Sequence, residues 1–407
     1  METNVIYCGD NTEVMRRDIL ENSIDLIYAD PPFFSNKHYE LIWDDGYELR
    51  SFEDRWKGGI QNYIAWMEPR LRECHRILKK TGSMYLHCDW HANAHLRVLM
   101  DKIFGENVFR NSIVWHYSGW NKKNKFNFNS RYDTILFYAK TDEQTFHSYA
   151  LPWKTKEEYV KIRKQKIRKD TNGREYVLSD AGGGKRVKRY LEEAMKAGAY
   201  VDDVWDIDKL NNSAKEALGY PTQKPEALLE RIVLASSDTL SIMLDPFCGC
   251  GTSIAVAHKL GRRWIGIDVS PTACKLMAKR MRSIGAKNIK TIGLPQTVEE
   301  LKALQPFEFQ NWVFEKLHGR VNPRKVGDYG IDGWIELDVP TQVKQSEDIG
   351  RNVVDNFETA IRRMGKKRGV IVAFSFGSGA YGEAARAHNE EGVEIKLKTV
   401  AEILKET

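Results

Sequence analysis

A strand that runs into a glycine-rich turn decides the fold of this chain. It reads Ser241-Ile242-Met243-Leu244-Asp245-Pro246-Phe247-Cys248-Gly249-Cys250-Gly251-Thr252. An apolar stretch of helical character follows, and a second strand ends on Asp268. Gly249 and Gly251 allow the backbone to turn sharply and to approach a ligand closely. The order strand, glycine turn, helix, strand and carboxylate predicts an α/β unit in which Asp268 accepts the two hydroxyls of a ribose.

The glycine pattern also narrows the kind of ligand. Dinucleotide-binding turns carry a third glycine three residues after the second, and they hold a pyrophosphate at the helix N-terminus. Ile254 occupies that third position here. The shortened pattern therefore favours an adenosyl ligand without phosphates.

A second turn, near the N-terminus, has a different chemical character. The apolar run 24–29 leads into Asp30-Pro31-Pro32-Phe33. Because proline cannot donate a backbone hydrogen bond, the two prolines stop the strand and stiffen an extended turn. Open α/β sheets bind their ligands at the carboxyl ends of strands, where this turn is expected. A carboxylate, carbonyls without sheet partners and an aromatic ring suit a flat ring that bears an amine.

Length and composition are those of an ordinary globular protein. The 407 residues, 42% apolar and 29% charged, are enough for two domains. No apolar stretch approaches the roughly 20 residues that span a bilayer, and the N-terminus lacks the charged and apolar regions of a signal peptide. The six cysteines show no spacing typical of a disulfide framework or a zinc site. We therefore expect a cytoplasmic protein with reduced thiols.

Strands and helices alternate over residues 1–290. Strands are expected over 4–8, 24–29, 83–88, 113–117 and 134–138, and helices over 60–78 and 91–104. Gly82 is expected to cap the carboxyl end of the first of these helices. Strand, helix and strand at this spacing predict a mostly parallel α/β sheet.

A basic segment interrupts this alternation between residues 142 and 217. From Lys154 to Arg189 the chain has 13 Lys or Arg against 5 Asp or Glu, with aromatic residues between them. A solvated helix face is one explanation, and a surface that binds nucleic-acid phosphates is the other. The residues that would bind DNA are Lys154, Lys161, Arg163, Lys185, Arg186, Lys188 and Arg189.

Three motifs together resemble those of amino-methylating DNA methyltransferases. Asp30-Pro31-Pro32-Phe33 is similar to their catalytic motif, and residues 245–252 are similar to their S-adenosylmethionine motif, Asp-Pro-Phe-x-Gly-x-Gly-Thr. Thr222-Gln223-Lys224-Pro225 looks like their second cofactor segment. The catalytic motif precedes the cofactor motif, as in the permuted β-group. The resemblance covers residues 1–290. It implies a Rossmann-like methyltransferase fold, circularly permuted, with 142–217 as the target-recognition region.

The resemblance also implies a role for each matching residue. Asp30 and the carbonyl of Pro31 would accept the hydrogens of the ring amine. Phe33, after Pro32, would stack on a base that is flipped out of the duplex. The cofactor-binding residues would be Asp10, Thr222, Lys224, Asp245, Phe247, Gly249, Gly251, Thr252 and Asp268. His87, His91 and His95 have the look of a metal set, but no metal is expected in this region because the reaction needs none.

The activity implied is transfer of a methyl group from S-adenosylmethionine to adenine N6 in double-stranded DNA, within a modification or restriction system. In this family a motif that begins with aspartate mostly marks adenine enzymes, and one that begins with serine mostly marks cytosine-N4 enzymes. Cytosine N4 is therefore the alternative target. A non-catalytic DNA-binding protein on the same scaffold and methylation of RNA or of a protein amide are further alternatives. Association into a homodimer stays open.

After a predicted linker over 291–304, residues 305–407 are expected to form a second, small α/β domain. Gly330-Ile331-Asp332-Gly333 and Gln342-Val343-Lys344 resemble the Mrr-like branch of restriction-type nucleases. The resemblance implies that Asp332 and Gln342, with Glu315 as a further acid, would bind Mg²⁺, and that Lys344 would stabilise the attacking water.

The general nuclease pattern has an acid where Gln342 stands, and this difference leaves two options open. One is a fusion of methyltransferase and nuclease with Mg²⁺-dependent DNA cleavage. The other is a DNA-binding module that does not cut, for which Mg²⁺ is not needed.

Overall fold

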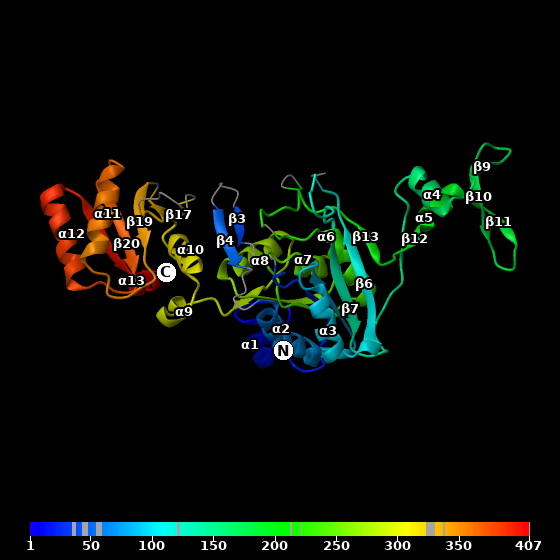
Figure 1. Ribbon diagram of the computed structural model, residues 1–407, viewed down its shortest axis with the longest axis horizontal. Coiled ribbons are helices and arrows are strands. Elements are labelled where there is room, and N and C mark those ends of the chain that lie inside the picture. Colours follow the sequence, from blue (N-terminus) through cyan, green and yellow to red (C-terminus); the bar gives the residue numbers. More distant parts are fainter. Residues whose placement is uncertain are drawn as a thin grey trace.

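The computed structural model describes residues 1–34, 38–42, 48–53, 59–119, 123–211, 214–220, 222–322, 330–336 and 338–406. Its largest element is a nine-stranded sheet, seen in Figure 1, with the order β13-β6-β7-β5-β2-β14-β15-β1-β16. In that order the strands are β13 (Val204–Asp206), β6 (Phe109–His116), β7 (Tyr132–Ala139), β5 (Leu78–Cys88), β2 (Ile24–Ala29), β14 (Ile242–Asp245), β15 (Arg263–Asp268), β1 (Val5–Cys8) and β16 (Lys290–Ile292).

The sheet is mixed, and one strand makes it so. Strand β7 is antiparallel to both β5 and β6, whereas the other neighbouring strands pair in parallel. Crossovers between parallel strands need a helix or a long connection, which explains the alternation of elements in the sequence. The predicted α/β sheet is therefore confirmed.

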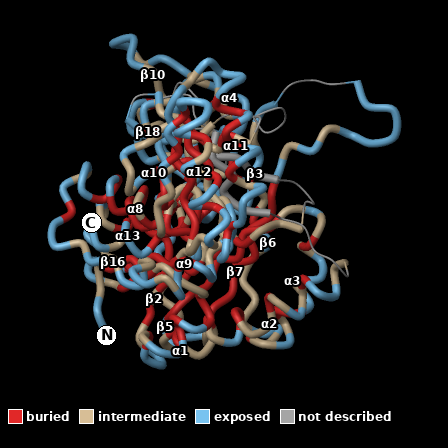
Figure 2. Tube along the Cα trace, turned by 90° about the vertical axis from the view of Figure 1, so that its left-hand side faces the viewer, coloured by how far each residue is buried: buried red, intermediate tan, exposed pale blue. Residues whose placement is uncertain are grey.

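Helices cover both faces of this sheet. Those on one face are α1 (Asn11–Asp18), α2 (Gly59–Ile77) and α3 (Asn93–Phe104), and those on the other are α6 (Glu226–Ser236), α7 (Thr252–Lys259) and α8 (Pro271–Ser283). Successive strand residues point to opposite faces, so Ile27 belongs to the first core and Tyr28 to the second. Figure 2 shows buried residues gathered around β2, β5 and β7.

The parallel strands bring their carboxyl ends to one edge of the sheet. Strand β2 pairs with β14 through Leu26 and Met243, and β14 pairs with β15 through Asp245 and Gly266. Asp30 therefore follows a strand end that lies next to the one carrying Asp245, although the two residues are far apart in the sequence.

The boundary between α2 and β5 differs from the prediction. Strand β5 begins at Leu78, directly after the helix, so Gly82 lies inside the strand and is not the C-cap. A β-carbon at Gly82 would lie 3.0 Å from the carbonyl oxygen of Ile24. Glycine is required here by close approach of backbones, which a helical reading of its position does not reveal.

The basic segment forms a small body of its own, which projects at the right of Figure 1. Its elements are β8 (Ala150–Leu151), α4 (Lys156–Arg163), β9 (Arg168–Lys169), β10 (Glu175–Asp180), β11 (Arg186–Tyr190), α5 (Leu191–Ala197) and β12 (Ala199–Tyr200). Tyr159, Val177, Leu191 and Ala194 make its core. The basic run is thus divided between a short helix and a three-stranded sheet.

A second sheet, of five strands, organises the C-terminal unit, defined here as residues 298–406. Its order is β17 (Arg320–Val321), β18 (Gly333–Ile335), β19 (Val339–Val343), β20 (Arg368–Ala373) and β21 (Glu394–Thr399). Its helices are α9 (Val298–Lys302), α10 (Pro306–Lys316), α11 (Arg351–Arg363), α12 (Ser378–Glu391) and α13 (Val400–Glu406). Two apolar clusters pack on this sheet.

Two further findings concern the ends of the units. Helix α9 lies within the stretch predicted as a linker, and its Leu301 is buried in the core of the C-terminal unit. In the sequence, a hairpin of β3 (His38–Ile42) and β4 (Glu48–Glu53) follows the Pro-Pro turn at residues 30–33 and precedes α2. None of the helices in the described ranges is both long and apolar enough to cross a membrane.

Close packing in the C-terminal unit gives a test of this fold. At Gly333 in β18, an added β-carbon would lie 2.2 Å from the Arg320 carbonyl oxygen and 2.5 Å from the Phe314 ring. We expect Gly333→Ala to destabilise the unit by about 1–3 kcal/mol, because backbone and ring must both move. Gly382→Ala, in open space on α12, should instead stabilise by about 0.5–1 kcal/mol. Calorimetric unfolding of both variants measures the difference, and equal midpoints would contradict the packing of β18.

Candidate active site

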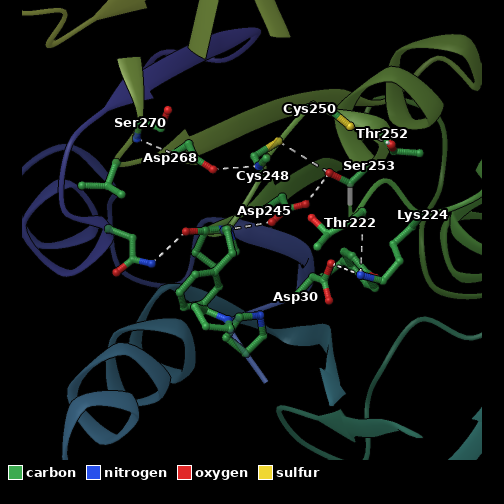
Figure 3. A pocket seen from close by; sticks show the side chains of 18 of the residues that line it. Asp30, Thr222, Lys224, Asp245, Cys248, Cys250, Thr252, Ser253, Asp268 and Ser270 are labelled. Atoms are coloured by element: carbon green, nitrogen blue, oxygen red, sulfur yellow. Dashed lines mark hydrogen bonds and ion pairs between the residues drawn. The ribbon is translucent and has the colours of Figure 1, made fainter. Parts of the chain in front are cut away.

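A cavity of about 370 Å³ opens at the carboxyl edge of the large sheet. Residues predicted from all three motifs meet there. Figure 3 shows Asp245 between Asp268 on one side and Asp30 with Lys224 on the other. The predicted residues that line the cavity are Asp10, Asp30, Pro31, Pro32, Phe33, Thr222, Lys224, Asp245, Phe247, Gly249, Thr252 and Asp268. Gly251 does not line it. Instead it precedes α7 with φ of 79°, and a β-carbon there would meet Met277 at 2.9 Å.

Asp245 is the more deeply buried of the two carboxylates from the glycine-turn motif. Its side chain accepts a hydrogen bond from the backbone N–H of Phe247 at 2.9 Å and another from the hydroxyl of Ser253. Burial raises the pKa of Asp245 to about 7, and these two donors offset only part of that effect. A cation that entered the cavity would therefore favour the ionised form.

Asp268 fixes the turn around it. One carboxylate oxygen accepts from the N–H of Ser270 at 2.9 Å and the other from the N–H of Gly249 at 2.8 Å. Burial raises the pKa of Asp268 to about 6, although the backbone donors act in the opposite direction. The carboxylate thus joins the end of β15 to the glycine turn after β14, and it faces the cavity between them.

Asp10 has a structural role in addition to lining the cavity. It caps the N-terminus of α1 by accepting from the N–H groups of Thr12 and Glu13. It also pairs with Arg70 at 2.5 Å, and the guanidinium of Arg70 lies 3.7 Å from the centre of the Trp66 ring. Neither Arg70 nor Trp66 was singled out from the sequence, because both belong to a helix whose pattern predicts only packing.

Asp30 has two unlike carboxylate oxygens. Oδ2 accepts a hydrogen bond from Nζ of Lys224, which lies 5.2 Å from the centre of the Phe33 ring. Oδ1 is buried and accepts no hydrogen bond from any residue that the structure describes. A buried acceptor without a donor is unfavourable, so this oxygen is suited to a hydrogen-bond donor on a ligand.

A buried histidine that the motifs did not reveal lies behind Asp30. His87 is fully buried, its Nδ1 is 2.8 Å from the hydroxyl of Tyr28, and the same nitrogen is 3.7 Å from Oδ1 of Asp30. Its Nε2 is 3.6 Å from Oδ2 of Asp133. Although burial acts in the opposite direction, His87 and Lys209 lower the pKa of Asp133 to about 2. Tyr28, His87 and Asp133 therefore form a connected set of polar side chains that lies directly behind Asp30.

Two of the three histidines considered as a metal set have different partners, and the third, His95, is exposed. His87 faces Tyr28 and Asp133, whereas His91 lies 2.8 Å from the carboxylate of Asp89 and stacks on Trp90.

Among the described residues, three carboxylates do meet in the C-terminal unit, at Asp355, Glu358 and Glu383. Arg386 pairs with both glutamates of that group.

In the C-terminal unit the structure brings together three of the four residues predicted there. Asp332 accepts a hydrogen bond at 2.7 Å from the N–H of Val343, the last residue of β19. Gln342 precedes Val343 in that strand, and Lys344 directly follows it. The side-chain amide of Gln342 donates to the carbonyl of Gly330, and its Oε1 is buried without a donor in the described part of the chain.

Glu315, the fourth of these residues, lies on α10. Its carboxylate pairs with Lys275 on α8, outside the C-terminal unit.

All seven basic residues predicted to bind DNA are exposed. They lie on or beside α4 and β11, and Lys188 is held by Asp170 at 3.1 Å. Helix α4 and the three-stranded sheet therefore present positive charge to solvent, and none of these seven residues lines the cavity.

The chain matches the family model described as DNA methylase, for enzymes of the N6/N4 type, over residues 24–280. It is similar to the DNA adenine methyltransferase YhdJ of Escherichia coli, 30% identical over 281 residues that cover 69% of this chain and 83% of that protein. The type II methyltransferase M.HinfI of Haemophilus influenzae is 30% identical over 289 residues, 69% of each chain.

Among solved structures, a modification methylase of Thermus thermophilus in complex with S-adenosylmethionine matches 71% of this chain and 99% of its own, with 18% identity and a TM-score of 0.43. The family match covers both motifs of the cavity and ends before the C-terminal unit. The chain therefore belongs to the N6/N4 DNA methylase family and is an S-adenosylmethionine-dependent, site-specific DNA methyltransferase.

Proposed function

We propose that the chain methylates N6 of adenine in double-stranded DNA, as a circularly permuted enzyme of the β-group. The observation that carries the proposal is the buried Oδ1 of Asp30, an acceptor without a donor among the described residues, in the same cavity as Asp245 and Asp268. The aspartate at the start of the catalytic motif and the adenine specificity in the name of the relative YhdJ both support adenine over cytosine.

The arrangement of strands supports the permuted order. Of the two strands that lead into the motifs, β2, before the catalytic motif, comes earlier in the chain. Strand β14, before the cofactor motif, comes about 200 residues later. The two strands are nevertheless direct neighbours in the sheet. Residues 142–217 separate them in sequence and would be the target-recognition region.

The residues of the cavity fit S-adenosylmethionine, which supplies an electrophilic methyl group when bound. Asp245 would neutralise the amino group of the methionine portion, and Asp268 would accept the ribose hydroxyls. Phe247 and Gly249 would line the adenosyl portion, with Thr222, Thr252 and Lys224 around it. Asp10 pairs with Arg70, and this pair would face the adenine ring of the cofactor.

Asp30 would act on the target amine through one oxygen. Lys224 holds Oδ2, which leaves Oδ1 to accept a hydrogen from the amine, while the carbonyl of Pro31 would accept the other. These acceptors localise the nitrogen lone pair as the N–C bond forms and the C–S bond of the sulfonium breaks, which leaves S-adenosylhomocysteine. They also stabilise the positive charge that develops on nitrogen. The proton that the methylated nitrogen then releases would pass to Asp30. Phe33 would stack on the flipped base.

Two phenylalanines that the sequence analysis did not single out extend the proposed DNA surface. Phe126 and Phe128 are 97% and 96% exposed on the connection between β6 and β7. Because β6 runs parallel to β2, this connection leaves the sheet at the same edge as the cavity. Exposed rings beside Lys123 and Lys125 suit stacking on bases near the flipped nucleotide.

The C-terminal unit has a second candidate function. Asp332 directly precedes β18, and Gln342 and Lys344 lie at the end of the neighbouring strand β19 and just after it. Asp332 accepts from the N–H of Val343 between them, and the buried Oε1 of Gln342 lacks a donor in the described residues. This arrangement supports an Mg²⁺-dependent nuclease of the Mrr-like type, with Lys344 near the attacking water. A unit that binds DNA without cutting it is the alternative.

Replacing Asp30 tests the methylation proposal. In a host without DNA methylation, the wild-type chain should produce N6-methyladenine at one short motif, and Asp30→Ala should lower methylation at least about 100-fold, because it removes the acceptor for the amine. Asp25→Asn is the matched control, because Asp25 lies on β2, the strand that leads to Asp30, and does not line the cavity. Its partners are Lys79 and the N–H of Ile242, which an amide oxygen can still accept from, so this variant should stay active. Single-molecule sequencing reads both bases, and N4-methylcytosine in place of N6-methyladenine would refute the choice of base.

The pH dependence of cofactor affinity tests Asp245. Its pKa is raised to about 7, so the carboxylate is protonated below that pH and can no longer neutralise the cofactor's amino group. We expect the dissociation constant for S-adenosylmethionine to rise up to about tenfold per pH unit below pH 7. Calorimetric titration between pH 5 and 7 measures it. Asp245→Asn should bind weakly with a flatter profile, and an unchanged profile in that variant would exclude the assignment.

Lys344 tests the nuclease proposal. With Mg²⁺, the full chain should nick unmethylated plasmid. Lys344→Ala and Asp332→Asn should each lower the nicking rate at least about tenfold. Lys366→Ala, which breaks an exposed pair with Asp338, serves as the control. Cleavage that survives Lys344→Ala refutes the proposed site, and absence of cleavage by the wild-type chain refutes the nuclease itself.

A further inference from the structure

Helix α10 of the C-terminal unit carries a carboxylate that is buried against the start of α8 in the methyltransferase domain. Glu308 is 5% exposed, and its two oxygens accept hydrogen bonds from the hydroxyls of Ser270 and Thr272, the latter at 2.8 Å. Both partners belong to the turn and first residues of α8, which follow β15. The polar contacts of this carboxylate thus lie across the boundary between the two units.

The partners of Glu308 are also part of the cofactor cavity. Ser270 lines it together with Val269 and Asp268. The N–H of Ser270 donates to Asp268 at 2.9 Å, and its hydroxyl oxygen accepts from the N–H of Ala273 and so caps α8. Two consecutive hydrogen bonds therefore connect Glu308 to the carboxylate that faces the cavity.

The cost of burying Glu308 indicates that this contact does more than join two surfaces. A carboxylate loses its hydration when buried, and burial raises the pKa of Glu308 accordingly. An apolar residue at this position would pack at lower cost. The neighbouring contact between Lys275 and Glu315 joins the same two helices through side chains that are 31% and 53% exposed, and neither residue lines the cavity.

We propose that Glu308 is a positioning residue for the cofactor: it holds Ser270, and through it Asp268, in the geometry that binds the ribose. The inference rests on the proposed role of Asp268. It makes docking of the C-terminal unit part of the cofactor site of a domain that the family match assigns to residues 24–280 alone. Because coupling between two equilibria is reciprocal, the bound cofactor would in turn strengthen the docking of the C-terminal unit.

The affinity of the full chain for S-adenosylmethionine tests this coupling. We expect Glu308→Ala to raise the dissociation constant about tenfold, equivalent to about 1.4 kcal/mol. The value of kcat at saturating cofactor and DNA should stay within about twofold, since Glu308 touches none of the reacting groups. Glu308→Gln, which keeps one acceptor and the shape, should lie between the wild type and Glu308→Ala. Calorimetric titration and methylation kinetics give the two quantities.

Glu315→Ala is the matched control, because it removes the exposed contact between the same helices and leaves the turn after β15 untouched. Its dissociation constant should equal that of the wild type. Ser270→Ala should weaken binding as Glu308→Ala does, and the double variant should be no weaker than the stronger of the two effects. Fully additive effects would mean that the two residues act separately, and would overturn the proposal.

The outcomes separate this proposal from the function on which it rests. Binding of S-adenosylmethionine by the wild-type chain, and its loss in Asp268→Ala, test the cofactor site itself. Given that binding, equal affinity in the wild type, Glu308→Ala and Glu308→Gln overturns the coupling. A lower melting temperature in Glu308→Ala with unchanged affinity also overturns it. If Glu308→Ala does not fold, Glu308→Gln decides the question by the same titration.

Discussion

The pairing of β2 with β14 is the constraint on which the rest of this structure depends. Leu26 and Ile27 lie beside Met243 and Leu244, and this register sets the carboxyl ends of the two strands side by side. The catalytic turn and the glycine turn then open into one cavity although the chain makes about 200 residues of other structure between them. A shift of one residue would turn every side chain of β2 to the opposite helix layer, so the two apolar cores hold the register.

Three aspartates at this edge illustrate how burial prepares a site for a ligand. Each has part of its hydrogen-bonding capacity satisfied by the chain: Asp245 by Ser253 and Phe247, Asp268 by two backbone N–H groups, and Asp30 by Lys224. The capacity that is left faces the cavity from a buried position, where an interaction with a donor or a cation is stronger than in water. Lys224 belongs to the segment 222–225, and its ammonium group donates to the carboxylate of Asp30. This hydrogen bond connects that segment to the Pro-Pro turn across the cavity.

The C-terminal unit is more than an appended body in this molecule. It brings its own sheet and two apolar clusters, and it also places a buried carboxylate against the turn after β15. Under the coupling proposed above, this contact gives the C-terminal unit a route by which it senses whether the cofactor site is filled. The exposed pair of Glu315 and Lys275 joins the same two helices beside this contact.

The sequence by itself determined the local chemistry: the glycine turn after β14, the Pro-Pro turn after β2, the carboxylate that ends β15, the alternation that makes an α/β sheet, and membership of a family that the comparisons confirmed. These features depend on residues close together in the chain, whose backbone preferences act wherever they stand. Only the tertiary structure decided which distant residues meet. His87 and Asp133 behind Asp30, Arg70 beside Asp10, Gly82 inside a strand and Glu308 across the boundary all depend on which strands pair and which helix faces turn inward. Those choices follow from burial summed over the whole chain, and no single stretch of sequence carries them.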